Sequence, residues 1–147
     1  MPFTALPQDE PIGLEASIWR FSSSLTKDSS GQIEICYVEK GGPKKILGVV
    51  PVRPFVSSES KMPDLRILVA RDMSSSERKV IVIVGYGIRS GVFVQDIPGM
   101  TSHSLFSDGN PKADSKGEIT LTGFTQGGGS TMELDGRLFF RYVSAAQ

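Results

Sequence analysis

Cysteine is almost absent from this sequence. Cys36 is the single thiol among 147 residues, so no disulfide can form within the chain. A chain of this length buries roughly 70% of the surface that its unfolded form exposes, so it needs neither a disulfide nor a metal to hold a core. Proteins without disulfides are typical of reducing compartments. We therefore expect a protein of the cytoplasm or of a virus particle.

An excess of either charge is also lacking. The 16 lysine and arginine residues balance 16 aspartate and glutamate residues. Nucleic acids are bound largely through neutralised phosphates, so a chain without net positive charge has no general attraction to them. Copies of a neutral protein repel one another only weakly, which favours self-association. The charge balance therefore favours a protein partner over nucleic acid.

Long hydrophobic runs are missing as well. The longest, Val80–Val84, is far too short to cross a bilayer. The first residues contain no basic stretch followed by an apolar one, so we expect no signal peptide. Asn110 is the only asparagine, and Pro111 after it excludes an N-glycosylation acceptor. We expect no membrane insertion.

Residues for catalysis and metal binding are scarce. His103 is the only histidine, and Cys36 lies within an alternating pattern, where a small buried hydrophobic residue belongs. One histidine and one cysteine do not make a zinc site without several carboxylates. The stretch 108–110, with Asp114 nearby, lacks the spacing of a calcium loop and fits turn chemistry better. We therefore expect no catalytic residue, metal or cofactor, and no enzyme.

What the sequence does contain is a period-2 alternation of apolar and polar residues. Segments of this kind, bounded by Gly, Pro, Asp and Ser, predict about eight or nine strands. Such spacing is typical of a single antiparallel β-sandwich, jelly roll or barrel. The predicted strands are Ile18–Phe21, Gln32–Lys40, Lys45–Arg53, Leu65–Ala70, Val80–Val84, Gly91–Ile97, Glu118–Phe124, Thr131–Leu134 and Arg137–Val143.

Proline and loop residues suggest how these strands are organised. Pro2, Pro7 and Pro11 predict that residues 1–13 form an extended N-terminal arm, because proline fixes φ and lacks an N–H. Residues 14–147 then form one all-β domain. The longest irregular stretch, 98–117, is of a length that is often functional or disordered.

The glycine-rich segment 85–91 follows the β-branched run Val80–Val84, whose two faces are both apolar. Apolar residues on both faces predict that this run is the most central strand of the sheet. The segment is similar to a dinucleotide-binding fingerprint, but Ser90 replaces its third glycine and no helix can follow. We therefore interpret 85–91 as a turn between two strands.

The end of the chain predicts a hairpin. Asp135-Gly136 suits a type I′ turn, which would place Met132 opposite Phe139. Large apolar groups would then lie on both faces of the hairpin. Either the hairpin lies between two layers of its own fold, or one face contacts another molecule. The residues on the second face are Leu138, Phe140 and Tyr142.

Three functional hypotheses follow. The first is a non-enzymatic assembly protein, a β-sandwich subunit that forms a homo-oligomer or docks on a larger shell such as a virus or phage particle. The second is a lectin-like module, in which Trp19, or Tyr86 beside Arg89, binds a glycan. The third is a β-barrel that stacks single-stranded nucleic acid on its aromatics. Candidate ligand or interface residues are Trp19, Tyr86, Arg89, Phe139, Phe140 and Tyr142.

Overall fold

Alternating apolar and polar residues form extended strands throughout the computed structural model. It describes residues 1–6, 16–26, 28–39, 41–54, 63–72, 79–96, 100–101, 111–126 and 136–145, and none of these is helical. The strands are β1 (Phe3–Ala5), β2 (Ala16–Ser23), β3 (Gly31–Glu39), β4 (Lys45–Val52), β5 (Leu65–Asp72), β6 (Lys79–Tyr86), β7 (Arg89–Asp96), β8 (Met100–Thr101), β9 (Glu118–Gln126) and β10 (Gly136–Ser144).

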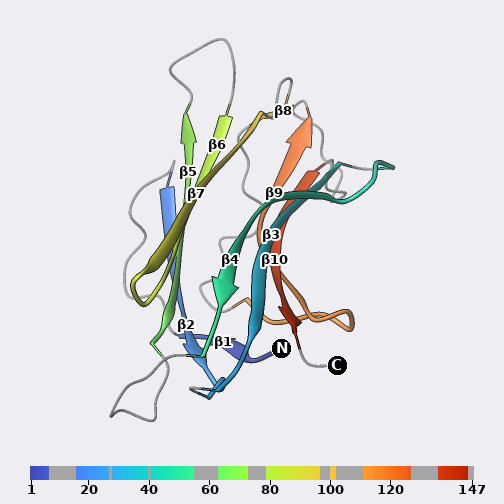
Figure 1. Ribbon diagram of the computed structural model, residues 1–147. Coiled ribbons are helices and arrows are strands. Elements are labelled where there is room, and N and C mark those ends of the chain that lie inside the picture. Colours follow the sequence, from blue (N-terminus) through green and yellow to red (C-terminus); the bar gives the residue numbers. More distant parts are fainter. Residues whose placement is uncertain are drawn as a thin grey trace.

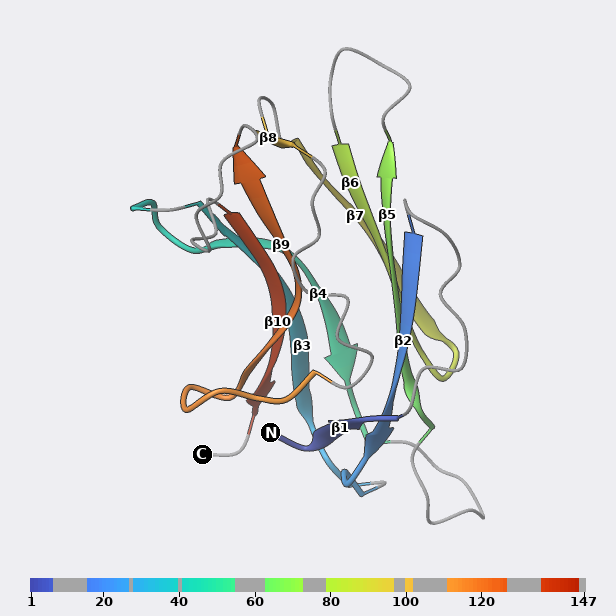
Figure 2. The same cartoon turned by 180° about the vertical axis from the view of Figure 1, so that it is seen from behind.

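The strands form two layers, which face each other in Figures 1 and 2. Sheet A has the order β1-β2-β5-β6-β7, and sheet B has the order β4-β3-β10-β9-β8. Neighbouring strands pair antiparallel in both sheets. The predicted all-β antiparallel sandwich is therefore confirmed, and the two sheets do not close into a barrel.

The core lies between the sheets and consists of the inward residues of each strand. Every second residue of β5 and β6 points inward, as the period of a strand requires. Each large aliphatic side chain buried in this way contributes about 1.5–3 kcal/mol to folding. Among the buried residues are Phe21, Ile33, Ile35, Leu65, Ile67, Val80, Val82, Val84, Ile119, Leu121, Leu138 and Phe140.

The turn between β6 and β7 confirms the interpretation of the glycine-rich segment. Tyr86 pairs with Arg89, so Gly87 and Ile88 form a two-residue hairpin loop. Gly87 has a φ of 62°, and no non-glycine residue in the described ranges has positive φ. Glycine with positive φ at the first loop position identifies a type II′ turn, whose twist matches that of the two strands.

The prediction that Val80–Val84 is the most central strand is wrong. The run lies in β6, which is second from the edge of sheet A, and β5 occupies the centre. Its inward residues are buried as expected, but Ile83 on the outward face is 42% exposed. An unbroken apolar run shows that both faces of a strand are apolar, but it does not show whether a second layer covers the outer face.

The first residues belong to sheet A. Residues 3–5 are extended, as the prolines predict, and they pair with β2 as its edge neighbour. Phe3 is buried between the sheets. The boundary of the predicted arm at residue 13 lies outside the described residues, so the division of the chain at that point stays a prediction.

The predicted register of the last hairpin is wrong. Phe139 pairs with Cys36 on one side and Thr120 on the other, so both edges of β10 are occupied by β3 and β9. Met132 therefore has no place opposite Phe139. The predicted strand 131–134 lies outside the described residues.

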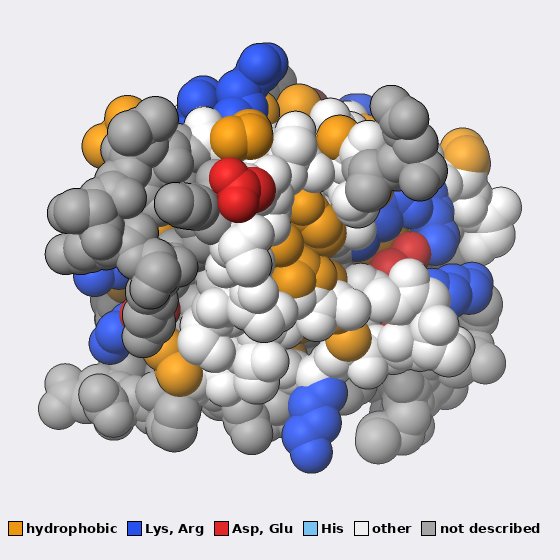
Figure 3. Space-filling model, turned by 60° about the horizontal axis from the view of Figure 1, so that its bottom comes forward, with side chains coloured by type: hydrophobic (Ala, Val, Ile, Leu, Met, Phe, Trp, Pro, Cys, Tyr) orange, Lys and Arg blue, Asp and Glu red, His pale blue; other side chains and the backbone are white. Residues whose placement is uncertain are grey.

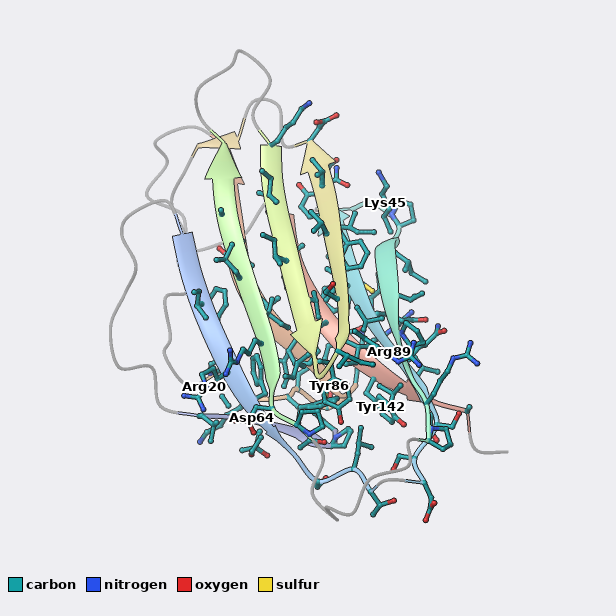
Figure 4. The ribbon with its side chains drawn as sticks, turned by 60° about the vertical axis from the view of Figure 1, so that its left-hand side comes forward. Arg20, Lys45, Asp64, Tyr86, Arg89 and Tyr142 are labelled. Carbon is teal, nitrogen blue, oxygen red and sulfur yellow. The ribbon has the colours of Figure 1, made fainter. Side chains whose placement is uncertain are left out.

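At one side of the sandwich the two sheets meet through a close contact between β4 and β7. The ring of Phe93 lies directly over Gly48, where a Cβ atom would overlap it. The same ring lies 2.5 Å from the position that a Cβ of Gly91 would take. Figure 4 shows β4 beside β7 at this side. Two glycines therefore allow one aromatic ring to join the edges of the sheets.

Candidate protein interface

The structure buries most of the residues that the sequence suggested for a site. Phe139 and Phe140 have no exposed surface, and Trp19 and Tyr86 are 3% and 4% exposed. Arg89 is exposed, and Tyr142 is half-buried. Only these last two therefore offer substantial side-chain surface, and a ligand or interface at the six residues stays a prediction.

Four of these six residues gather around one end of the sandwich. The ring of Phe3 makes edge contacts with the rings of Tyr86, Phe140 and Tyr142, at centroid distances of 5.7, 6.3 and 6.1 Å. Arg89 is the cross-strand neighbour of Tyr86. Figure 4 places Tyr86, Arg89 and Tyr142 at this end, and Figure 3 shows hydrophobic side chains in the centre of the same face.

The two tyrosine hydroxyl groups at this aromatic end interact with other residues of the fold. Burial raises the pKa of Tyr86, and its hydroxyl oxygen lies 3.4 Å from that of Ser23, whose hydrogen bond lowers the pKa in part. The hydroxyl of Tyr142 donates to the backbone oxygen of Ser30. Trp19 belongs to the same buried core, in the row of sheet A next to that of Tyr86. Neither Trp19 nor Tyr86 therefore presents an open ring face to a sugar.

Charged residues cluster on the outward face of sheet B. The Glu118 carboxylate is 2% exposed and accepts hydrogen bonds from Lys44 and, at 2.9 Å, from Arg137. The same two cations lie over the Phe139 ring, with Arg137 4.3 Å from its centroid. Burial alone would raise the pKa of Glu118, but the two hydrogen bonds outweigh it and keep the pKa low. The cluster therefore covers Phe139 with paired charges.

A second ion pair lies next to the thiol. The Arg141 guanidinium donates to the Glu34 carboxylate at 2.7 Å, and Gln32 donates to its other oxygen. Cys36, between these groups and Phe139, has no exposed surface. Burial raises its pKa to about 11. The thiol is therefore protonated at neutral pH and unsuited to nucleophilic attack, and His103 lies outside the described residues.

Metal binding finds no support in the part of the chain that the structure describes. No group of three or more His, Cys, Asp or Glu residues there could hold an ion. Asp114 instead accepts hydrogen bonds from the backbone of Lys116 and Glu118, and Gly117 has a φ of 76°. Asp114 is therefore a turn residue that leads into β9, as turn chemistry predicts.

The outward face of sheet A carries an exposed apolar surface. Cross-strand pairing aligns Leu68, Ile83 and Val92 in one row. Ala70, Ile81 and Val94 form the next row. Val92 is 63% exposed, Val94 52% and Ile83 42%. We call these six residues the aliphatic face, and Figure 4 looks onto their strands. Adjacent exposed aliphatic side chains of this kind are typical of contact surfaces.

Sequence reasoning missed the aliphatic face although its signal was present. Apolar residues occupy both faces of Val80–Val84, and Val92 and Val94 continue them on the next strand. We interpreted that signal as the mark of the most central strand of the sheet. An exposed interface gives the same pattern, and only the arrangement of the two layers separates these cases.

Together these features define a two-sheet antiparallel β-sandwich with an aliphatic face on one sheet and a paired ionic cluster on the other. No protein-family model, curated protein or solved structure gives a significant match to this chain. Among the described residues, the structure has no helix long and apolar enough to span a membrane.

Proposed function

We propose that this protein is a non-enzymatic assembly subunit that associates with copies of itself through the aliphatic face. The observation that carries the proposal is the set of adjacent, exposed side chains on β6 and β7, of which Val92 on the edge strand β7 is the most exposed at 63%. Each such side chain gains about 25 cal/mol for every Å² of apolar area that contact removes from water. Repeated association could also build a larger shell, such as a virus or phage particle.

Charge and the rest of the surface support the same proposal. The chain has no net charge, so little long-range repulsion opposes contact between copies. The ionic cluster on sheet B is satisfied by its own ion pairs. Unlike the aliphatic face, it gains little from a partner. Because Trp19 and Tyr86 are buried, no observation favours glycan binding as a second candidate.

A substitution on the aliphatic face tests this proposal. Val92→Lys places a charge on the exposed surface, where it costs the monomer little but must lose its hydration in a contact. Val143→Lys is the matched control, because Val143 is 40% exposed at the end of β10 on sheet B. We expect sedimentation velocity to show dissociation for Val92→Lys alone. Equal association of both variants and the parent chain would reject the aliphatic face.

Deleting residues 1–13 is a poor test of assembly. The deletion removes Phe3, which packs between the sheets against Tyr86 and Phe140. A loss of association would then follow from a loss of stability. Point substitutions on exposed positions keep the two effects apart.

A further inference from the structure

We propose that β7 of one copy pairs with β7 of a second copy, antiparallel and edge to edge, across a two-fold axis perpendicular to sheet A. This pairing rests on the proposed function, because it names the strand through which the copies associate. The two copies of sheet A would then form one continuous sheet. The contact closes, since both copies use the same edge and leave none of it free.

Three of the four edge strands of the sandwich carry features that oppose pairing with another chain. β1 has three residues and β8 has two, and short edge strands offer few backbone groups. β4 begins at Lys45, contains Pro51 and pairs with β3 through a register shift. Lysine, proline and a bulge at an edge all hinder the addition of a strand.

The fourth edge strand, β7, has none of these features. It is eight residues long, contains neither proline nor lysine, and pairs with β6 along its whole length without a register shift. Figure 4 shows it at the side of sheet A, next to β4. β4 contacts it through the inward ring of Phe93 and forms no ladder with it in the described ranges. This edge is therefore suited to accept another strand.

The hairpin turn decides which backbone groups of β7 are available. Tyr86 and Arg89 close the two-residue loop as a hydrogen-bonded pair, and such pairs recur at every second residue of the ladder. Phe93 therefore bonds to β6, whereas the N–H and C=O groups of Val92 and Val94 point away from it. In the part of the chain that is described, no other strand binds these groups.

The same residues select one register. Residues opposite each other in a ladder point to the same side of the sheet, so outward residues of one copy must face outward residues of the other. One such register places Val92 opposite Val94, and Ser90 opposite Asp96, at both ends of the pair. A slip of two residues one way sets Val92 against Asp96. The opposite slip sets Val94 against Ser90. Only the first register joins apolar to apolar and polar to polar side chains.

The charges at the two ends of β7 also fit a second copy. The strand begins with Arg89 and ends with Asp96, and both are exposed. The antiparallel pair brings the first residue of each strand beside the last residues of the other, so Arg89 lies next to the position that faces Asp96. Parallel strands would instead place like charges side by side. The strand is therefore complementary to itself in the antiparallel direction.

The pairing predicts an association of moderate strength. Each of the two Val92–Val94 pairs exchanges both of its backbone hydrogen bonds, which gives about four between the copies. The backbone oxygen of Asp96 already accepts a hydrogen bond from the Gln95 side chain at 2.7 Å, so the ladder ends there. Each new bond replaces bonds to water and contributes modestly. We therefore expect a concentration-dependent dimer, with twice the monomer mass of 15.9 kDa.

Removal of one N–H group tests the backbone contact. Val94→Pro keeps an apolar side chain but lacks the N–H that points to the free edge, where proline is tolerated. Each copy loses one hydrogen bond, so the dissociation constant should rise roughly thirtyfold. Val94→Thr, the matched control, keeps both the shape and the N–H and should associate nearly as the parent chain does. Sedimentation velocity compares the variants.

A contact made by side chains alone predicts the reverse order. Val94→Thr would then weaken association at least as much as Val94→Pro, because it adds a hydroxyl to an apolar surface, and this result would overturn the edge pairing. Circular dichroism checks that each variant is folded. Val92→Pro, which removes the equivalent N–H, replaces Val94→Pro if that variant does not fold.

Disulfide formation tests the register. Val92→Cys mixed with Val94→Cys should form a mixed disulfide with oxidised glutathione, because opposite Cα atoms in a hydrogen-bonded pair lie about 5.5 Å apart. Neither variant should form one alone, since identical residues then lie beyond the limit of roughly 7 Å. Cys36 is buried and should not react, and Val49→Cys, at a position 43% exposed on β4, controls for random collision. A disulfide of Val92→Cys with itself would overturn this register.

The outcomes separate this inference from the proposed function. If Val92→Lys dissociates the protein but the cysteine mixture forms no disulfide, the edge pairing is wrong and the proposed function stands. A protein that is monomeric at every concentration contradicts both.

Discussion

Single residues in this protein act mainly by allowing close contacts. Gly48 has no side chain because the Phe93 ring occupies that space, whereas Gly85 on β6 has none although its surroundings are open. Both glycines lie within strands, where the residue is otherwise unfavourable. The difference between them shows that Gly48 is required by packing and Gly85 is not.

This contrast gives a first prediction. Gly48→Ala should lower the free energy of unfolding by about 1–3 kcal/mol, because its Cβ overlaps the Phe93 ring and the two sheet edges must separate. Gly85→Ala, the matched control, should change stability by less than about 0.5 kcal/mol. Urea denaturation measures both. Equal stabilities of the two variants would show that the β4–β7 contact does not constrain the fold.

Glu118 is the residue whose ionisation matters most. Burial raises the pKa of this carboxyl, but the hydrogen bonds from Lys44 and Arg137 prevail and lower it below the ordinary value. A lowered pKa in the folded state stabilises the protein above the ordinary glutamate pKa. That contribution is lost as the pH falls through the folded-state value.

Glu118→Gln should therefore be less stable than the parent chain at pH 7, by about 1.5–3 kcal/mol. The difference between them should shrink as the pH falls through the lowered pKa. Thermal unfolding followed from pH 7 to pH 3 measures this difference. Asp28→Asn, at an exposed turn position, is the control and should change stability at pH 7 by less than about 0.5 kcal/mol. If the difference in stability between Glu118→Gln and the parent chain did not change with pH, the ion-pair explanation would be contradicted.

At the level of elements, β1 is more important than its length suggests. It has three residues at the edge of sheet A, yet Phe3 contacts rings from both sheets. An edge strand of this kind closes one end of the core. The prolines predict the extended conformation of these residues. The burial of Phe3 depends on contacts between the sheets, which no local sequence pattern predicts.

Phe3→Ala should consequently cost about 3–5 kcal/mol, as expected for an aromatic removed from a core. Thr4→Ala changes the exposed neighbour in the same strand and should cost less than about 0.5 kcal/mol. Chemical denaturation with tryptophan fluorescence compares them, since Trp19 is buried and the only tryptophan. Similar values for the two variants would mean that β1 does not contribute to the core.

Most strands could be predicted from the sequence because alternation is a local property. β3, β4, β5, β7, β9 and β10 each lie within a few residues of the predicted segments. The surroundings of each strand were not predictable in this way. The outer side of Val80–Val84 is exposed rather than covered, and the outer side of Phe139 is covered by Lys44 and Arg137. Both depend on contacts between residues far apart in the chain.

At the level of the whole molecule, the two outward faces differ in kind. Sheet B covers its buried outer residues with ion pairs from its own side chains. Sheet A leaves Ile83, Val92 and Val94 exposed on its outward face. A protein with no net charge and one such face has a surface through which copies can associate.

Sedimentation equilibrium of the unmodified protein across a wide concentration range tests this most directly. We expect the average mass to rise from the monomer value of 15.9 kDa towards twice that value as the concentration increases. Val92→Lys should stay at the monomer value under the same conditions. A mass of 15.9 kDa for the unmodified chain at every concentration would contradict association through the aliphatic face.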